Sequence, residues 1–106
     1  MKDMAAVIEK ANQLHDRLAG NIKSRESRVG RSLMILKHLK KIMNIYEEEY
    51  YQSLIKYFDF IDHYTQDVGV IFDSNNFEAF RKICSVLDNL EMELNEFEQL
   101  YPLIPQ

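Results

Sequence analysis

The sequence has few residues that interrupt regular secondary structure. Only three of its 106 residues are glycine and only two are proline, and both prolines, Pro102 and Pro105, lie near the C-terminal end. Because Gly and Pro punctuate chains built of many short strands and turns, their scarcity argues against a β-rich fold. It predicts few, long helices.

Cysteine and long apolar runs are also scarce. Cys84 is the only cysteine, which excludes an internal disulfide and a cysteine-based metal framework and agrees with a reducing compartment. The longest uncharged apolar runs, such as residues 32–36 and 68–72, are far shorter than the roughly 20 residues that a membrane helix requires. The first residues lack the apolar core of a secretory signal. We therefore expect a cytoplasmic protein without a membrane helix.

What remains is the composition of an ordinary folded domain. The chain is 46% hydrophobic and 28% charged, which is too apolar for a disordered protein. Its length suits one hydrophobic core, since single cores take about 100 to 150 residues. The sequence predicts one domain over residues 1–106.

Apolar residues recur at helical spacing in three segments, at about residues 2–19, 31–68 and 75–101. The first stripe consists of Met4, Val7, Ala11, Leu14 and Leu18, with Gly20 as the expected stop. The second consists of Ile35, Leu39, Ile42, Tyr46, Tyr50, Leu54, Tyr57, Ile61, Tyr64 and Val68. The third consists of Phe80, Ile83, Leu87, Leu90, Leu94, Phe97 and Tyr101, in a strict three-four alternation that is typical of coiled coils. The pattern predicts an all-α, antiparallel three-helix bundle with coiled-coil-like packing.

Turn and capping residues predict where the last two helices meet. Gly69 and the polar run 73–76 indicate a turn, because short polar side chains compete for backbone hydrogen bonds. Asn75 is the expected N-cap of the third helix, with Glu78 at position N3. Pro102 is its expected stop.

The middle helix is unusually long for a chain of this size. From residue 31 to residue 68 it would measure roughly 57 Å at about 1.5 Å per residue, whereas a compact domain of about 100 residues has a radius of gyration of about 13 Å. Two explanations are open. Either the molecule is elongated and shares its core with a second copy, or the helix is broken near Glu47, Glu48 and Glu49, which interrupt the apolar pattern.

Charge is divided unevenly along the sequence. Residues 1–41 contain ten Lys and Arg against four Asp and Glu, a net charge of +6, and residues 42–106 contain three against thirteen, a net charge of −10. The basic part is either a surface for nucleic acid or another acidic partner, or it pairs with the acidic part within the chain or across a dimer. Its bases form no single stripe and no aromatic residues lie among them for stacking on nucleobases. Pairing is therefore the favoured interpretation.

The charged side chains of the basic segment, residues 17–41, are predicted to serve recognition or pairing and to lie outside the core. If the middle helix extended backward without a break, Arg25 and Arg28 would fall on its apolar face at about 100° per residue, and burying unpaired arginines there would cost several kcal/mol. A break near Gly30, or a helix that projects beyond the bundle, would avoid this cost. The candidate recognition residues of this basic segment are Arg25, Arg28, Arg31, Lys37, Lys40 and Lys41.

The aromatic residues are concentrated in one part of the sequence. Ten of the twelve lie between Tyr46 and Phe80, and residues 54–61 are apolar around most of the helix circumference, so this part must be covered on more than one side. Flanking helices in a bundle centre or a partner could cover it, and tyrosine suits both because its ring packs while its hydroxyl stays hydrated. The candidate interaction residues are Tyr46, Tyr50, Tyr57, Phe58, Phe60 and Tyr64.

No motif in the sequence carries catalytic or metal chemistry. Asp59, His63 and Asp67 are spaced by four residues along one helix face, but the Glu-x-x-His pairs of di-metal helical bundles are missing, and a solvated polar face explains them. Cys84 follows Ile83 on the seam of the third helix and is interpreted as a small core residue. We therefore expect no enzyme activity, no metal and no cofactor.

The long helix, the turn at residues 73–77 and the acidic amphipathic helix after it are similar to those of small secretion chaperones, which are also acidic and helical. That resemblance implies a groove that holds a helix of a client protein. The leading hypothesis is a non-enzymatic, self-associating helical interaction module that binds a protein partner, a second copy or both. The alternatives are such a chaperone, and a binder of nucleic acid or acidic surfaces through residues 17–41.

Overall fold

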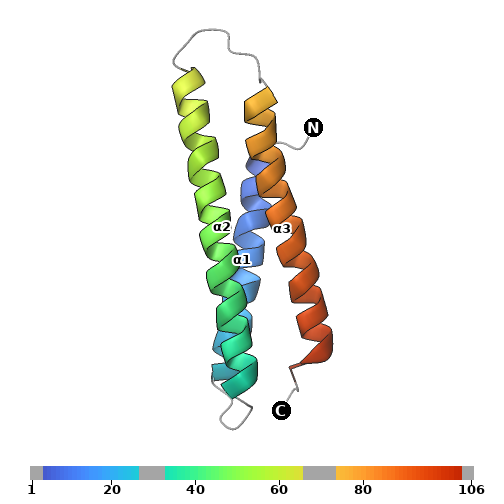
Figure 1. Ribbon diagram of the computed structural model, residues 1–106. Coiled ribbons are helices and arrows are strands. Elements are labelled where there is room, and N and C mark those ends of the chain that lie inside the picture. The colour runs from blue at the N-terminus through green and yellow to red at the C-terminus, as the bar shows by residue number, and fades with distance from the viewer. Residues whose placement is uncertain (1–3, 27–32, 66–73, 104–106) are drawn as a thin grey trace.

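The computed structural model describes residues 4–26, 33–65 and 74–103, and the outermost residues of the predicted middle helix, 31–32 and 66–68, lie outside them. The helices are α1 (Met4–Glu26), α2 (Leu33–Thr65) and α3 (Ser74–Leu100). Successive helices run in opposite directions and each packs against the other two (Figure 1). The described residues contain no strand. The predicted antiparallel three-helix bundle is confirmed.

The bundle is elongated, with extents of 58 × 21 × 17 Å along its principal axes and a radius of gyration of 17.0 Å. α2 continues without a break through Glu47, Glu48 and Glu49, so the alternative of a broken middle helix is wrong. The three acids are tolerated because Glu48 and Glu49 are exposed, while half-buried Glu47 lies opposite His15 of α1, with 3.9 Å between Oε1 and Nε2. The prediction of an elongated bundle is confirmed.

The predicted apolar faces of the three helices meet in one core. Leu39, Ile83, Leu87 and Leu94 are its most completely enclosed large side chains among the described residues. The other buried apolar residues are Val7, Ala11, Leu14, Leu18, Ile42, Tyr50, Tyr57, Val86, Leu90 and Phe97. All of these except Val86 belong to a predicted stripe. One narrow apolar stripe on each helix is enough to form this core, because residues three and four positions apart lie on the same side of a helix.

The first helix is longer than predicted. It includes Gly20, where we expected a stop, and it replaces the first part of the polar connection expected between residues 20 and 31. Gly20 is exposed, and apart from its chain neighbours and the adjacent helix backbone no atom lies within 4 Å of where its Cβ would be. Glycine at such a site lowers helix stability by about 1 kcal/mol without ending the helix. The helix continues because Asn21 and Arg25 extend the buried face of Leu18 in steps of three and four.

The third helix begins and ends close to the predicted residues. It begins at Ser74, one residue before the expected N-cap Asn75, and ends two residues before Pro102. The amide of Tyr101 still donates to the carbonyl of Phe97 at 2.8 Å, so helical hydrogen bonding continues up to the residue that precedes the proline. Among the described residues, no helix has the length of apolar surface that a membrane crossing needs.

Candidate functional site

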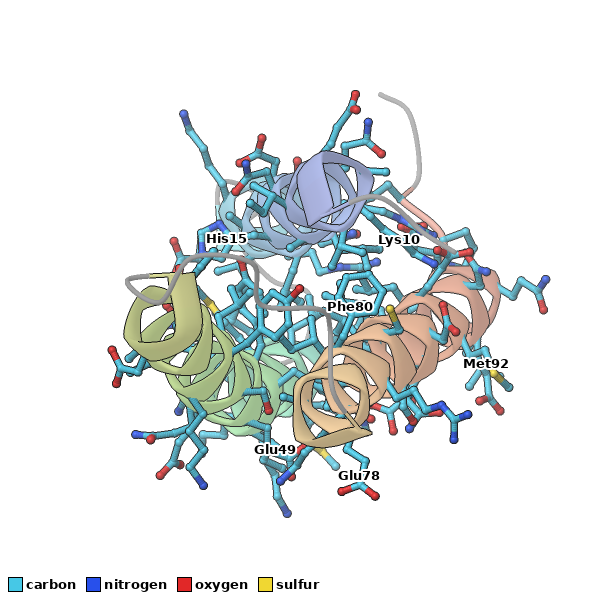
Figure 2. All side chains as sticks on the ribbon, turned by 90° about the horizontal axis from the view of Figure 1, so that it is seen from above. Lys10, His15, Glu49, Glu78, Phe80 and Met92 are labelled. Carbon is cyan, nitrogen blue, oxygen red and sulfur yellow. The ribbon has the colours of Figure 1, made fainter. Side chains whose placement is uncertain are left out.

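The basic and acidic parts of the chain pair with each other along α1 and α3. Lys10 points from α1 toward α3 (Figure 2), and its Nζ lies 2.7 Å from Asp88 Oδ1 and 3.1 Å from Glu91 Oε2. Arg17 donates to both carboxylate oxygens of Glu98, from Nε at 2.8 Å and from Nη2 at 2.7 Å. These hydrogen bonds raise the pKa of Lys10 and of Arg17. Pairing within the chain therefore accounts for part of the charge asymmetry.

The Arg17–Glu98 pair should make the bundle sensitive to acid. Donation by Arg17 lowers the pKa of Glu98 below its ordinary value of 4.5, against the opposing effect of partial burial. Because the unfolded chain binds this proton more tightly, the pair stabilises the fold above the unfolded pKa, and this contribution is lost as the pH falls through the folded pKa. When the pH is lowered from 7 to about 3, we expect the melting temperature of Glu98→Gln to fall less than that of the unaltered chain. Circular dichroism measures both melting temperatures. Glu96→Gln, at an exposed acid of α3, is the control, and an unchanged acid dependence in Glu98→Gln would contradict the account.

Arg25 is buried at the same junction of α1 and α3. It is 8% exposed, so the prediction that the charged side chains of residues 17–41 lie outside the core is wrong at this position. Its guanidinium lies 4.8 Å from the centroid of the Phe97 ring, and Nη2 donates to the backbone carbonyl of Tyr101. Carbonyls at a helix C-terminus lack partners within the helix, and the negative end of the helix dipole attracts a cation. The arginine is therefore buried with an acceptor and an aromatic ring, which the projection onto the middle helix did not anticipate.

The other candidate residues of the basic segment do not form one site. Arg28 and Arg31 lie outside the described residues. Lys37, Lys40 and Lys41 are exposed near the start of α2. Lys40 Nζ lies 3.1 Å from Glu26 Oε1 and so joins α2 to the end of α1, whereas Lys41 borders a groove between α2 and α3.

Two of the candidate aromatic residues belong to the core. Tyr50 and Tyr57 are buried, and burial raises the pKa of both hydroxyls. The Tyr57 ring packs against Phe80 of α3, with 5.6 Å between ring centroids. Core packing, one of the two explanations that the sequence left open, accounts for this pair.

The remaining candidate aromatic residues are less buried or lie outside the described side chains. Tyr46 is half-buried and Phe58 is exposed, while the side chains of Phe60 and Tyr64 are not among those described. Ile55, beside Phe58 on the outer side of α2, is exposed as well. Part of the apolar circumference predicted around residues 54–61 is therefore uncovered in the single chain.

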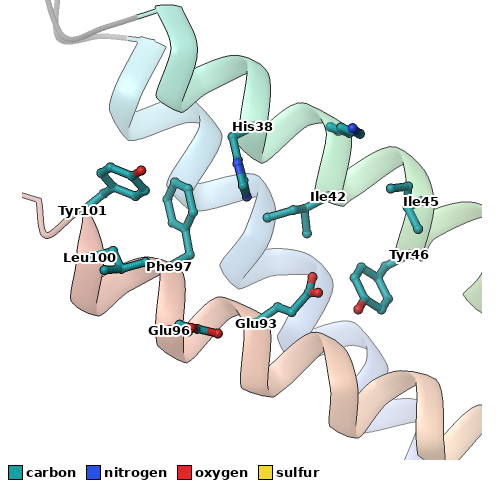
Figure 3. A pocket seen from close by; sticks show the side chains of 10 residues that line it. His38, Ile42, Ile45, Tyr46, Glu93, Glu96, Phe97, Leu100 and Tyr101 are labelled. Atoms are coloured by element: carbon teal, nitrogen blue, oxygen red, sulfur yellow. The ribbon is translucent and has the colours of Figure 1, made fainter.

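A groove of about 470 Å³ lies between the first half of α2 and the second half of α3. In Figure 3 it opens toward the viewer and α1 passes behind it, so it lies on the side of the α2–α3 pair that α1 leaves open. Buried Ile42 and Phe97 form its floor, and Ile45 and Leu100 border it from opposite helices. The lining residues are His38, Lys41, Ile42, Ile45, Tyr46, Glu93, Glu96, Phe97, Leu100 and Tyr101.

The two walls of this groove carry opposite charge. Lys41 lies on the α2 wall, and Glu93 and Glu96 lie on the α3 wall. Burial, together with the neighbouring carboxylate of Glu93, raises the pKa of the Tyr46 hydroxyl. Tyr46 and Glu93 point toward one another across the groove (Figure 3), and the polar contact crosses an otherwise apolar floor.

Sequence reasoning missed the two exposed aliphatic residues of the groove. Ile45 and Leu100 lie beside the predicted stripes and read as isolated apolar residues, which are common on protein surfaces. The available signal was their spacing: each follows a buried residue, Ile42 or Phe97, by three positions and therefore extends its stripe to one flank. That both flanks face the same groove depends on how α2 and α3 are rotated against each other.

A second hollow of about 460 Å³ lies farther along the same two helices and is more polar. Its lining residues are Glu48, Glu49, Gln52, Ser53, Lys56, Lys82 and Val86. Val86 is buried and the other side chains are polar, so this hollow offers no exposed large aliphatic residue among the described positions.

Metal and nucleophile chemistry receive no support from the described residues. No group of three or more His, Cys, Asp or Glu in the described ranges is placed to hold a metal ion. Asp59 is exposed, and the side chain of His63 and all of Asp67 fall outside the description. Cys84 is half-buried and packs against the core.

Comparison of the chain with protein-family models, with curated proteins and with solved structures found no match.

Proposed function

We propose that the protein is a non-enzymatic helical interaction module whose groove between α2 and α3 receives a helix of a protein partner. The supporting observation is that Ile45 is 44% and Leu100 is 66% exposed on opposite walls of a groove with a buried apolar floor. Complete burial of a large aliphatic side chain contributes about 1.5 to 3 kcal/mol. Covering what remains exposed of these two residues would favour binding by roughly 2 kcal/mol.

The shape of the groove favours a helix as its occupant. α1 covers one side of the α2–α3 pair, and the opposite side, from which Glu49 projects, is open (Figure 2). A helix that lies along this open side would complete a four-helix arrangement, and amphipathic helices bind such grooves through apolar residues spaced by three and four. Its polar flanks would meet the charged walls.

The basic segment supports nucleic-acid binding less well. Arg17 is held by Glu98, Arg25 lies buried at the end of α3, and Lys40 pairs with Glu26. Proteins contact nucleic-acid phosphates through accessible Lys and Arg side chains, and side chains engaged in this way are less available for such contacts.

A chaperone would use the same groove, and its occupant would be a client helix.

Site-specific photo-cross-linking tests the proposal. A benzophenone amino acid in place of Ile45, in chains expressed in cells, should form covalent protein adducts because this position lies within the occupied groove. The control position is Met92, which is 69% exposed and points outward from α3 (Figure 2). Adducts from position 45 at no higher yield than from position 92 would contradict the proposal.

A further inference from the structure

The walls of the groove do not suit a helix of uniform charge. Lys41 on one wall and Glu93 and Glu96 on the other are exposed. Among the ion pairs that join described residues, none involves these three side chains. A mainly acidic helix would be attracted by Lys41 and repelled by the two glutamates. A mainly basic helix would be repelled by Lys41 and attracted by the two glutamates.

A second copy of the chain satisfies both walls at once. A twofold axis parallel to the helices and centred over the groove exchanges the two walls, so α2 of each protomer lies over α3 of its partner. Lys41 of each copy then faces Glu93 and Glu96 of the other. Ile45 and Leu100 of both copies lie between these contacts, and each helix of the four has antiparallel neighbours, as in up-down four-helix bundles.

We infer that the partner is a second copy of this chain, whose α2 and α3 together cover the groove in place of a single helix, bound by contact of the basic wall of each protomer with the acidic wall of its partner. This inference rests on the proposed function and names its partner. The opposite charges of the walls support it, because a contact of two identical surfaces requires each surface to be complementary to itself.

The second hollow limits how far this contact extends. Glu48, Glu49 and Lys56 of α2 and Lys82 of α3 border that hollow. The same twofold axis places Lys82 of one copy over Glu48, Glu49 and Lys56 of the other, so attraction and repulsion oppose each other there, and no described residue of this hollow is an exposed large aliphatic one. The contact is therefore confined to the groove end of the face, where it falls in the class of small interfaces with weak, reversible association.

Sedimentation velocity of the full chain tests the inference. We expect reversible dimers with a dissociation constant of about 1 to 100 μM. Lys41→Glu, and separately Glu93→Lys with Glu96→Lys, should each weaken the dimer about tenfold or more. An equimolar mixture of these two variant proteins should recover the original affinity to within about threefold, because every wall contact again joins opposite charges. Circular dichroism establishes that each variant is folded.

Two results would overturn the inference: a chain that stays monomeric at about 100 μM, or a mixture that does not recover the affinity. A monomeric chain whose position 45 still cross-links to a different protein in cells would defeat the second copy as occupant and leave the proposed function standing. Absence of both dimer and adduct would defeat both.

Discussion

Replacing Leu94 by alanine should lower the free energy of unfolding by about 2 to 5 kcal/mol. Leu94 is 0% exposed and lies on the seam of α3, between Leu90 and Phe97. The two neighbouring helices enclose its side chain. Truncation to alanine therefore removes apolar contacts and leaves a cavity that the rigid surroundings fill only in part. Leu87→Ala should behave in the same way, since Leu87 is equally enclosed.

The controls for this prediction lie on the same helix. Met92→Ala removes a side chain of similar size from the solvent side of α3, and Glu96→Ala removes an exposed acid. Both should stay within about 0.5 kcal/mol of the unaltered chain. Urea unfolding followed by circular dichroism provides the comparison, and losses of equal size in the two sets would show that the buried face of α3 has been misassigned.

Replacing Arg25 by alanine should cost about 2 to 5 kcal/mol. The change removes a charge-assisted hydrogen bond to the Tyr101 carbonyl and a contact with the face of the Phe97 ring. Hydrogen bonds to charged groups contribute about 1.5 to 3 kcal/mol, and a cation over an aromatic ring adds about 0.5 to 2 kcal/mol when it is shielded from water. Because this contact joins α1 to the last turn of α3, its loss should loosen that end of the bundle.

Two further variants separate the polar contact from simple packing. Arg25→Met keeps an apolar stem of similar length and should recover only part of the loss. Lys23→Ala, two residues earlier in α1 and exposed, should stay within about 0.5 kcal/mol. A loss in Arg25→Ala no larger than in Lys23→Ala would show that Arg25 contributes nothing to the junction.

The three-helix fold is predictable because each apolar stripe follows the helical period. In α3, Ile83, Leu87 and Leu94 follow one another at intervals of four and seven residues, which keeps them on one face of the helix, and all three are enclosed as expected. The elongated shape follows from the length of the middle stripe. Local spacing determines both features, so no knowledge of how the helices contact one another is needed.

Features that depend on contacts between helices were not predictable. Gly20 reads as a stop in sequence, yet the helix passes through it because packing of α1 against α3 outweighs a local cost of about 1 kcal/mol. Arg25 reads as unburiable until the carbonyl of Tyr101, from the other end of the chain, is placed beside it. The cost of burying a charge depends on its partners, which a single helix projection does not contain.

The candidate interaction site shows the same limit. Tyr50 and Tyr57 were candidates for an interface and belong to the core, whereas Ile45 and Leu100 were not singled out and border the groove. The rotation of α2 against α3 decides which apolar residue faces inward and which lies at the rim. That rotation is set by side-chain packing between the two helices and is not encoded in the period of either one.

The mass of the adduct formed from position 45 tests the central claim most directly. With purified chain alone at about 100 μM, a benzophenone side chain at position 45 should give an adduct of twice the 12.6 kDa of the chain, and the same group at position 92 should not. If position 45 gives no adduct above the yield of position 92, either with the purified chain or in cells, the groove between α2 and α3 is not an interaction site and the account is contradicted.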